Sequence, residues 1–420
     1  MRLMIKKIIL FTKGIETLWY FSEQLGKELE ILGYDVFYFD QCKEYRSLSD
    51  LIWFCEPKVT AAISFNFDGC SGEDYFIDSK GVSFFDAREV TFINIVVDHP
   101  FYYHKFAPYL PKKYIQISID REHEAYLKRF FPEIQRGPFV PLGGTGLWTE
   151  KTLPGWEERP IDIVFTGNYN PPSIFHEAIH RHGEEYAEFY MDIIHDLITH
   201  PWKSMDATMI EHMLRDVEDV TEDGMKEALP NMIFIDLYVR HYMRGQVVKT
   251  LVDAGYEVYC FGAGWDKLDC EHPENIRKGD VLDSLGCLQQ ISRAKISLNV
   301  MPWFKDGAHD RIFNSMLNGA VCLSDGSRYL DEILHDGKDY RLYDLAHLEK
   351  LPDMVHDILS NRVGANAEEC LYVGVEKAHM GRPGAEDSSR NSLQDTVICG
   401  KIKCADAHAG HQASLGDRLK

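Results

Sequence analysis

The segment spanning residues 294–325 limits the possible folds more than any other part of the chain. Residues 295–300 form a short apolar and β-branched run, which predicts a buried strand, and residues 301–309 contain the proline and glycine typical of a loop. Residues 310–317 carry apolar side chains at helical spacing, and residues 320–323 form a second apolar run. A strand, a loop, a helix and a strand in this order predict a βαβ unit of a parallel sheet.

The loop and the helix start of this unit belong to the carboxyl edge of the sheet, where open α/β folds bind ligands. A helix N-terminus offers free N–H groups and a positive dipole end, and Arg311 falls in the first turn of the predicted helix. We therefore expect a phosphate or diphosphate site here. The simpler alternative is an ordinary βαβ unit in which Arg311 forms a surface ion pair.

The first part of the chain alternates between strand and helix signals. Strands are predicted at residues 7–12, 35–39, 61–65, 92–97 and 114–119. Alternation of this kind predicts the α/β class, with a doubly wound parallel sheet. We assign residues 1–154 to this first Rossmann-like domain.

A polar, proline-containing linker at residues 149–160 precedes a second alternating region. Residues 155–360 are predicted to form a second Rossmann-like domain, which begins with a strand at residues 161–166 and contains a helical insertion at residues 173–250. Residues 361–420 hold no period for long and are rich in glycine, alanine, serine and histidine. This tail is expected to be poorly ordered.

Composition excludes several kinds of partner. The 420 residues carry a formal net charge of −21, which argues against a general nucleic-acid or anionic-membrane binder. No apolar stretch is long enough to predict a transmembrane segment, and the start of the chain is interpreted as a first strand rather than a signal peptide. The ten cysteines form no close CxxC pair, so we expect reduced thiols, a cytoplasmic location and no zinc site.

An ordered set of short motifs follows in the second half of the chain. The strand at residues 161–166 ends in a glycine, Phe261 is followed by Gly262, Ala263, Gly264 and Trp265, and a Ser-Leu-Asn strand ends at Asn299. Arg-x-Phe then opens a helix at Arg311, and an apolar strand leads into Asp325. Over about residues 160–350, this set resembles the C-terminal domain of GT-B glycosyltransferases of the CgeB-like, spore-maturation-protein-like type.

The resemblance implies a GT-B fold, with two Rossmann-like domains that face a cleft, and the transfer of a sugar from a nucleotide sugar to a glycan or protein acceptor. It implies no metal and no cofactor apart from the nucleotide-sugar substrate. The donor-binding residues that it implies are Gly262, Gly264, Trp265, Asn299, His309, Arg311, Asn314 and Asp325. The alternatives are purely structural roles: a plain turn for the two glycines and a core position for Trp265.

A general base is expected in the first domain. Asp98 and His99 follow a predicted central strand, and the sequence Val-Val-Asp-His-Pro at this point resembles the Asp-x-Pro of the family. Either side chain can accept the proton of an acceptor hydroxyl, and His104 and His309 are further candidates. The alternative for Asp98 is a cap of the following turn. His180, His182 and His195 lie at no metal-ligand spacing and are interpreted as solvated or structural.

The chain departs from the family pattern in two places. Asn314 stands where the resemblance expects glutamate, so the amide there can form hydrogen bonds but carries no charge. The tail lacks the expected His-Thr-Trp-like motif. Read one nucleotide later, permitted codons for residues 374–386 encode such a motif, and we interpret the tail as frameshifted upstream of Gly374. Chance is the alternative, because codon degeneracy allows many readings.

Two other functions remain open at this point. A sugar-nucleotide epimerase can share the architecture, and a non-catalytic binding or assembly protein with a decayed site would fit Asn314 and the altered tail. A serine-hydrolase elbow, a dinucleotide fingerprint and a P-loop are missing from the sequence, which disfavours a hydrolase, a dehydrogenase and a P-loop NTPase.

Overall fold

The structure is a computed structural model that describes residues 5–147 and 153–361. The expected disorder of the tail, and the reading-frame hypothesis attached to it, concern residues 362–420 and lie outside the described residues.

The first domain is built on one parallel sheet. Its strands are β1 (Lys7–Thr12), β2 (Asp35–Asp40), β3 (Thr60–Phe65), β4 (Thr91–Val96) and β5 (Tyr114–Ser118). They lie in the order β2-β1-β3-β4-β5, and all neighbours are parallel. All six residues of β3 are buried, as expected for a central strand with two covered faces. The helices are α1 (Glu16–Ile31), α2 (Glu44–Phe54), α3 (Phe84–Ala87) and α4 (Arg121–Phe130), with a 3-10 helix at Pro100–Tyr109.

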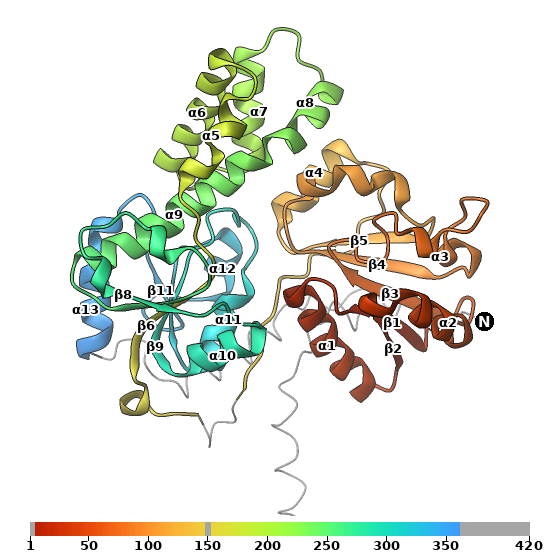
Figure 1. Cartoon of the computed structure of the whole chain (residues 1–420), viewed down its shortest axis with the longest axis horizontal. Coiled ribbons are helices and arrows are strands. Elements are labelled where there is room, and N and C mark those ends of the chain that lie inside the picture. Colours follow the sequence, from red (N-terminus) through yellow and green to blue (C-terminus); the bar gives the residue numbers. More distant parts are fainter. Residues whose placement is uncertain (1–4, 148–152, 362–420) are drawn as a thin grey trace, which may run out of the picture.

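The second domain contains a six-stranded parallel sheet. Its strands are β6 (Ile161–Thr166), β7 (Val258–Phe261), β8 (Ile276–Gly279), β9 (Ala294–Asn299), β10 (Val321–Ser324) and β11 (Arg341–Leu342), in the order β11-β10-β9-β6-β7-β8. The helices beside it are α10 (Ser284–Ser292), α11 (Asp310–Leu317), α12 (Arg328–Ile333) and α13 (Leu351–Asn361). The predicted fold class, two Rossmann-like parallel sheets with a helical insertion, is therefore confirmed (Figure 1).

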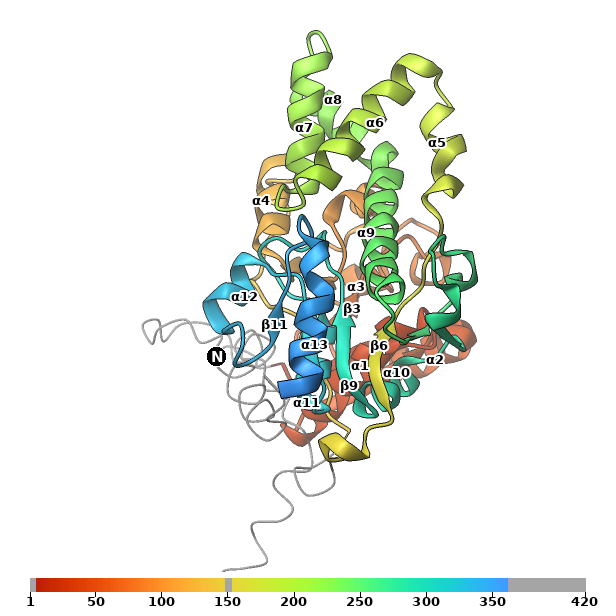
Figure 2. The ribbon, with the colours of Figure 1, turned by 90° about the vertical axis from the view of Figure 1, so that its left-hand side faces the viewer.

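A group of helices between β6 and β7 forms the insertion. Its helices are α5 (His176–His180), α6 (Glu184–Thr199), α7 (Met205–Asp216), α8 (Glu222–Ala228) and α9 (Ile233–Asp253). Figure 2 shows α9 running from this group down to the second sheet. The insertion also shares an apolar core with the first domain, because Phe101, Tyr126 and Phe130 lie in one buried cluster with Met209 and Leu229. It therefore connects the two domains.

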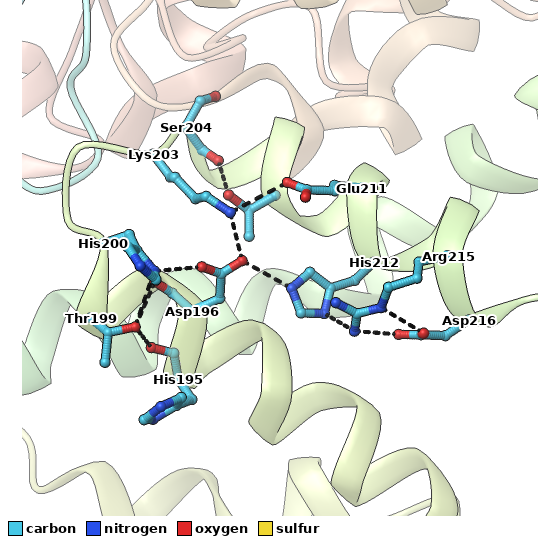
Figure 3. A network of polar contacts seen from close by, with 11 residues as sticks. His195, Asp196, Thr199, His200, Lys203, Ser204, Glu211, His212, Arg215 and Asp216 are labelled. Atoms are coloured by element: carbon cyan, nitrogen blue, oxygen red, sulfur yellow. Dashed lines mark hydrogen bonds and ion pairs between the residues drawn. The ribbon is translucent and has the colours of Figure 1, made fainter.

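Polar contacts hold the insertion together. Asp196 on α6 accepts hydrogen bonds from His200 (2.8 Å), Lys203 (2.9 Å) and His212 (3.1 Å), as Figure 3 shows. Partial burial acts in the opposite direction, but these bonds lower the pKa of Asp196 to about 2. The network ties α6 to α7, and we assign it a structural role.

The two sheets are also joined directly. Asp120, at the end of β5, is fully buried, and its Oδ2 accepts from the backbone N–H groups of Lys305 (3.0 Å) and Asp306 (2.9 Å). Arg121 donates to Glu332 of α12 at 2.6 Å and to Asp306 at 3.1 Å. The loop after β9 is therefore anchored on the first domain.

Some elements carry weak sequence signals and were not predicted. The edge strand β8 has the sequence Ile-Arg-Lys-Gly, so it lacks an apolar run, and only Ile276 of it is buried. Helix α8 is short and polar. The periodicity of residues 173–198 predicts one helix or a broken pair, and the structure has the pair, because Gly183, with a φ of 95°, separates α5 from α6.

Candidate active site

Arg311 lies at the point where the strand order of the second sheet reverses. Strands β6 and β9 are neighbours, and the chain leaves β6 toward β7 on one side and β9 toward β10 on the other, which makes their carboxyl ends a topological switch point. From α11, Nε of Arg311 donates to Oγ1 of Thr166 (3.0 Å), and Nη1 donates to Oδ1 of Asn299 (3.0 Å). Thr166 ends β6 and Asn299 ends β9. The guanidinium therefore spans the place where such sheets bind ligands.

Two arginines from α9 join it. Arg240 and Arg244 are one turn apart, and their guanidinium carbons lie 4.1 Å and 5.2 Å from the ring centroid of Trp303. Nη1 of Arg244 donates to the backbone oxygen of Asn168 (3.1 Å), just beyond the end of β6. Nη2 of Arg240 donates to Oδ2 of Asp236 (2.8 Å). We call Arg240, Arg244 and Arg311 the arginine cluster.

Burial and like charge act together on the arginine cluster. Burial, together with the charges of Arg240 and Arg311, lowers the pKa of Arg244 well below the ordinary value of an arginine. Burial and the same three arginines lower the pKa of His309, which keeps this imidazole neutral. Buried Nε atoms of Arg240 and Arg244, and Nδ1 of His309, have no hydrogen-bond partner in the described part of the chain. An anion placed here would meet unused donors and relieve the charge repulsion.

Asp98 faces the arginine cluster from the first domain. It follows β4, and its Oδ2 accepts from Nδ2 of Asn66 (2.9 Å) and from the hydroxyl of Tyr103 (3.0 Å). Asp98 is also close enough to Arg240 for its charge to raise the pKa of that guanidinium. A half-buried carboxylate of the first domain thus lies near the arginine cluster of the second.

His99, the other residue expected to act as base, has a different environment. It is 8% exposed, its Nδ1 accepts from the backbone N–H of Phe101 (3.3 Å), and its Nε2 lies 3.6 Å from Oδ1 of Asp206 on α7. Its ring packs on those of His123 and Tyr126. The structure therefore places His99 in the contact between the first domain and the insertion.

The glycines after β7 are needed for packing between two turns. A Cβ atom on Gly262 would clash with the backbone of Gly167, and one on Gly264 would clash with the backbone of Tyr169. Trp265 is 2% exposed, and its Nε1 donates to the backbone oxygen of Gly167 (2.8 Å). These three residues shape the turn beside Arg244, and the ring of Trp265 belongs to the core instead of presenting a free face to a base.

Asn314 and Asp325 form hydrogen bonds to segments that flank the arginine cluster. Oδ1 of Asn314 accepts from the backbone N–H of Thr145 (2.8 Å), and its Nδ2 donates to Oδ2 of Asp310 (2.9 Å). Asp325 is buried, and its Oδ1 accepts from the backbone N–H of Met301 (2.8 Å), which anchors the loop after β9. Burial raises the pKa of Asp325 to about 7.

Arg240 and Arg244 are the site residues that the sequence did not predict. The apolar side chains of residues 232–254 predict a packing helix, and that prediction assigns no role to the charged residues of the helix. Asp236, Arg240 and Arg244 recur at intervals of four, so they form one row along α9, and this row is the signal that could have marked a buried ionic face.

Two kinds of feature are missing from the described residues. Within residues 5–147 and 153–361, no group of three or more His, Cys, Asp and Glu side chains is arranged to hold a metal ion. No helix in the same ranges is long and apolar enough to cross a membrane.

Part of the chain matches a known family model, and several solved structures are similar to the chain at low identity. Residues 241–376, about a third of the chain, match a family model described as glycosyl transferase-like, and no curated protein matches. A sucrose-phosphate synthase from Thermosynechococcus elongatus is similar at 12% identity, over 89% of this chain and 93% of that one, with a TM-score of 0.46. AviGT4, a glycosyltransferase involved in avilamycin A biosynthesis, is similar at 11% identity, over 88% and 92%, with a TM-score of 0.44. The family-model match, on a chain with two Rossmann-like sheets, supports a transferase of the glycosyltransferase class.

Proposed function

We propose that this protein is a glycosyltransferase that moves a sugar from a nucleoside diphosphate sugar to a hydroxyl group of a glycan or protein acceptor. The observation that carries the proposal is the arginine cluster, in which three guanidinium groups meet at the switch point of the second sheet with buried donors unused. We further propose the CgeB-like type, on the resemblance of residues 160–350, and a cytoplasmic location, because the ten cysteines of the sequence form no close CxxC pair.

The cluster would act on the leaving group. Breaking the bond between the sugar and the diphosphate leaves negative charge on the phosphate oxygens, and fixed cations in a low-dielectric site stabilise that charge. Arg311 and Arg244 would donate to these oxygens, and Arg240 would contribute charge from beside Trp303. Free N–H groups at the start of α11 add to the same field. We expect this set to suffice without a metal ion.

Asp98 would be the general base. Its carboxylate lies on the first domain opposite the cluster, so an acceptor hydroxyl between the two domains could pass its proton to Asp98 while its oxygen attacks the anomeric carbon. His99 is a weaker choice, because its two ring nitrogens already face the backbone of Phe101 and the carboxylate of Asp206.

The test is turnover of a panel of UDP-, GDP- and dTDP-sugars, with release of the nucleoside diphosphate as the readout, by this chain and by a version with the restored reading frame. Release that increases with added glycan or peptide acceptor supports transfer. Conversion of the donor sugar without release indicates the epimerase. If neither chain binds or converts any nucleotide sugar, the proposal is wrong.

A further inference from the structure

We infer that Asn66 and Tyr103 are positioning residues that hold the carboxylate of Asp98 in one rotamer for proton transfer. The inference rests on the proposed function, in which Asp98 is the base. Both residues act through Asp98, and their side chains reach it from the loop after β3 and from the 3-10 helix at Pro100–Tyr109.

One amide group links the backbone before Asp98 to its side chain. Oδ1 of Asn66 accepts from the backbone N–H of Val97 (2.8 Å), and Nδ2 of Asn66 donates to Oδ2 of Asp98 (2.9 Å). Since a backbone N–H can only donate, the amide oxygen must face Val97, and the NH₂ group must face the carboxylate. The orientation of Asn66 is therefore fixed by its own hydrogen bonds.

The loop that carries Asn66 is held in an unusual conformation. Asn66 and Phe67 have φ values of 47° and 70°, a region that few residues other than glycine adopt. The ring of Phe67 is buried and lies 5.0 Å from that of Tyr103, and the backbone N–H of Phe67 donates to Oδ1 of Asn94 (3.1 Å). Packing against Tyr103 therefore stabilises the same loop that brings Asn66 to Asp98, as is typical of strained segments beside functional groups.

Both donors reach the same oxygen of Asp98. Among the described residues, the hydrogen bonds to this carboxylate end on Oδ2, which leaves Oδ1 available for the acceptor proton. The hydroxyl of Tyr103 remains a donor at working pH, because burial, and then the charge of Asp98, raise the pKa of Tyr103. Arg240 is the cation that faces the carboxylate from α9.

Two variants separate positioning from folding. Asn66→Gly removes both amide hydrogen bonds at a backbone position that glycine adopts without strain, and Tyr103→Phe removes one hydroxyl while it keeps the ring. Lys58→Gly is the control, because Lys58 has a φ of 67° and is exposed in the same domain. On the nucleotide sugar that the panel identifies, we expect kcat to fall at least tenfold in both variants, with KM and the affinity for UDP within twofold, and no change in Lys58→Gly.

A readout without turnover makes the test independent of the proposed function. We expect the amide hydrogen of Val97 to exchange at least tenfold faster in Asn66→Gly than in the native chain or in Lys58→Gly, because its acceptor is gone. Unchanged exchange at Val97 would overturn the inference whether or not the protein turns over a donor. Unchanged kcat in both variants, or a fall in kcat that is matched by the loss of UDP affinity or of Tm, would overturn it as well. If the native chain converts no donor, the proposed function fails, and the exchange rates still decide whether Asn66 holds this segment.

Discussion

Nη1 of Arg311 donates to Oδ1 of Asn299 across 3.0 Å, and this contact joins the first turn of α11 to the last residue of β9. It fixes a cation at the carboxyl edge of the second sheet before any ligand is present. Sites whose charges are held in place in advance stabilise developing negative charge without reorganisation.

Replacing Arg244 separates stability from binding. Burial and two neighbouring cations lower the pKa of Arg244, so Arg244→Gln should leave the Tm of the free protein unchanged or raise it. The same change should reduce the rise in Tm that UDP produces, since one phosphate partner is lost. Thermal melts with and without UDP measure both effects, with Arg46→Gln, at an exposed arginine of α2, as the control. A lower Tm of the free variant with a full UDP response would show that Arg244 is a structural residue.

Asp98→Asn should stop the chemistry and spare donor binding. The amide keeps the shape of the carboxylate but cannot accept the acceptor proton, so we expect kcat to fall by about 10²- to 10⁴-fold, with UDP affinity within threefold. Asp50→Asn, at an exposed position of α2, is the control and should change neither kcat nor the affinity for UDP. Steady-state kinetics and calorimetry give the two numbers. A variant that retains more than a third of native kcat would remove Asp98 from the mechanism.

Trp265 should contribute more to the stability of the fold than to binding of the nucleotide base. It is almost fully buried and packs on Phe165 and Tyr169, with ring centroids 5.2 Å apart in both pairs. We expect Trp265→Ala to lower the free energy of unfolding by about 3–5 kcal/mol. Trp265→Phe should keep UDP affinity within threefold. A large loss of UDP affinity in Trp265→Phe at unchanged stability would instead place the ring against the base.

Asp325 predicts a pH dependence of stability. Burial raises its pKa from 3.8 to about 7, so the folded state holds this proton more tightly than the unfolded state. Its contribution to stability is therefore complete below about pH 4 and is lost as the pH rises to about 7. The side chain of Asp325→Asn is uncharged at every pH. As the pH rises through this window, the free energy of unfolding of the variant should therefore increase relative to that of the native chain, by at most about 4 kcal/mol. Denaturant unfolding at pH 4.5 and 8 checks this, and a constant difference between the two proteins would contradict it.

Most of the fold could be predicted from local sequence patterns, because these patterns mark side chains that are buried in the structure. The apolar face of α11 was predicted with its observed bounds because Ile312, Phe313 and Met316 are buried at helical spacing. Strands such as β1 and β6 were predicted for the same reason. The polar edge strand β8 has no such face, and its place is decided by pairing with β7.

The site was predicted less completely, because its parts meet only in three dimensions. Arg311 and Asn299 belong to one βαβ unit, so a role in donor binding could be proposed for both from the sequence of that unit. Arg244 reaches the same point from α9, and Asp98 reaches it from another domain, so no local pattern links them. Likewise, His99 lies 3.6 Å from Asp206, which is more than a hundred residues away in the sequence.

Calorimetric titration with inorganic pyrophosphate tests the arginine cluster most directly, because this probe carries the diphosphate without a base or a sugar. We expect the native chain to bind pyrophosphate in a salt-dependent manner, and Arg311→Gln and Arg244→Gln each to weaken binding about tenfold or more, with Arg46→Gln unchanged. Equal pyrophosphate affinities in all four proteins, or no binding by the native chain, would contradict the assignment of this cluster as the diphosphate site.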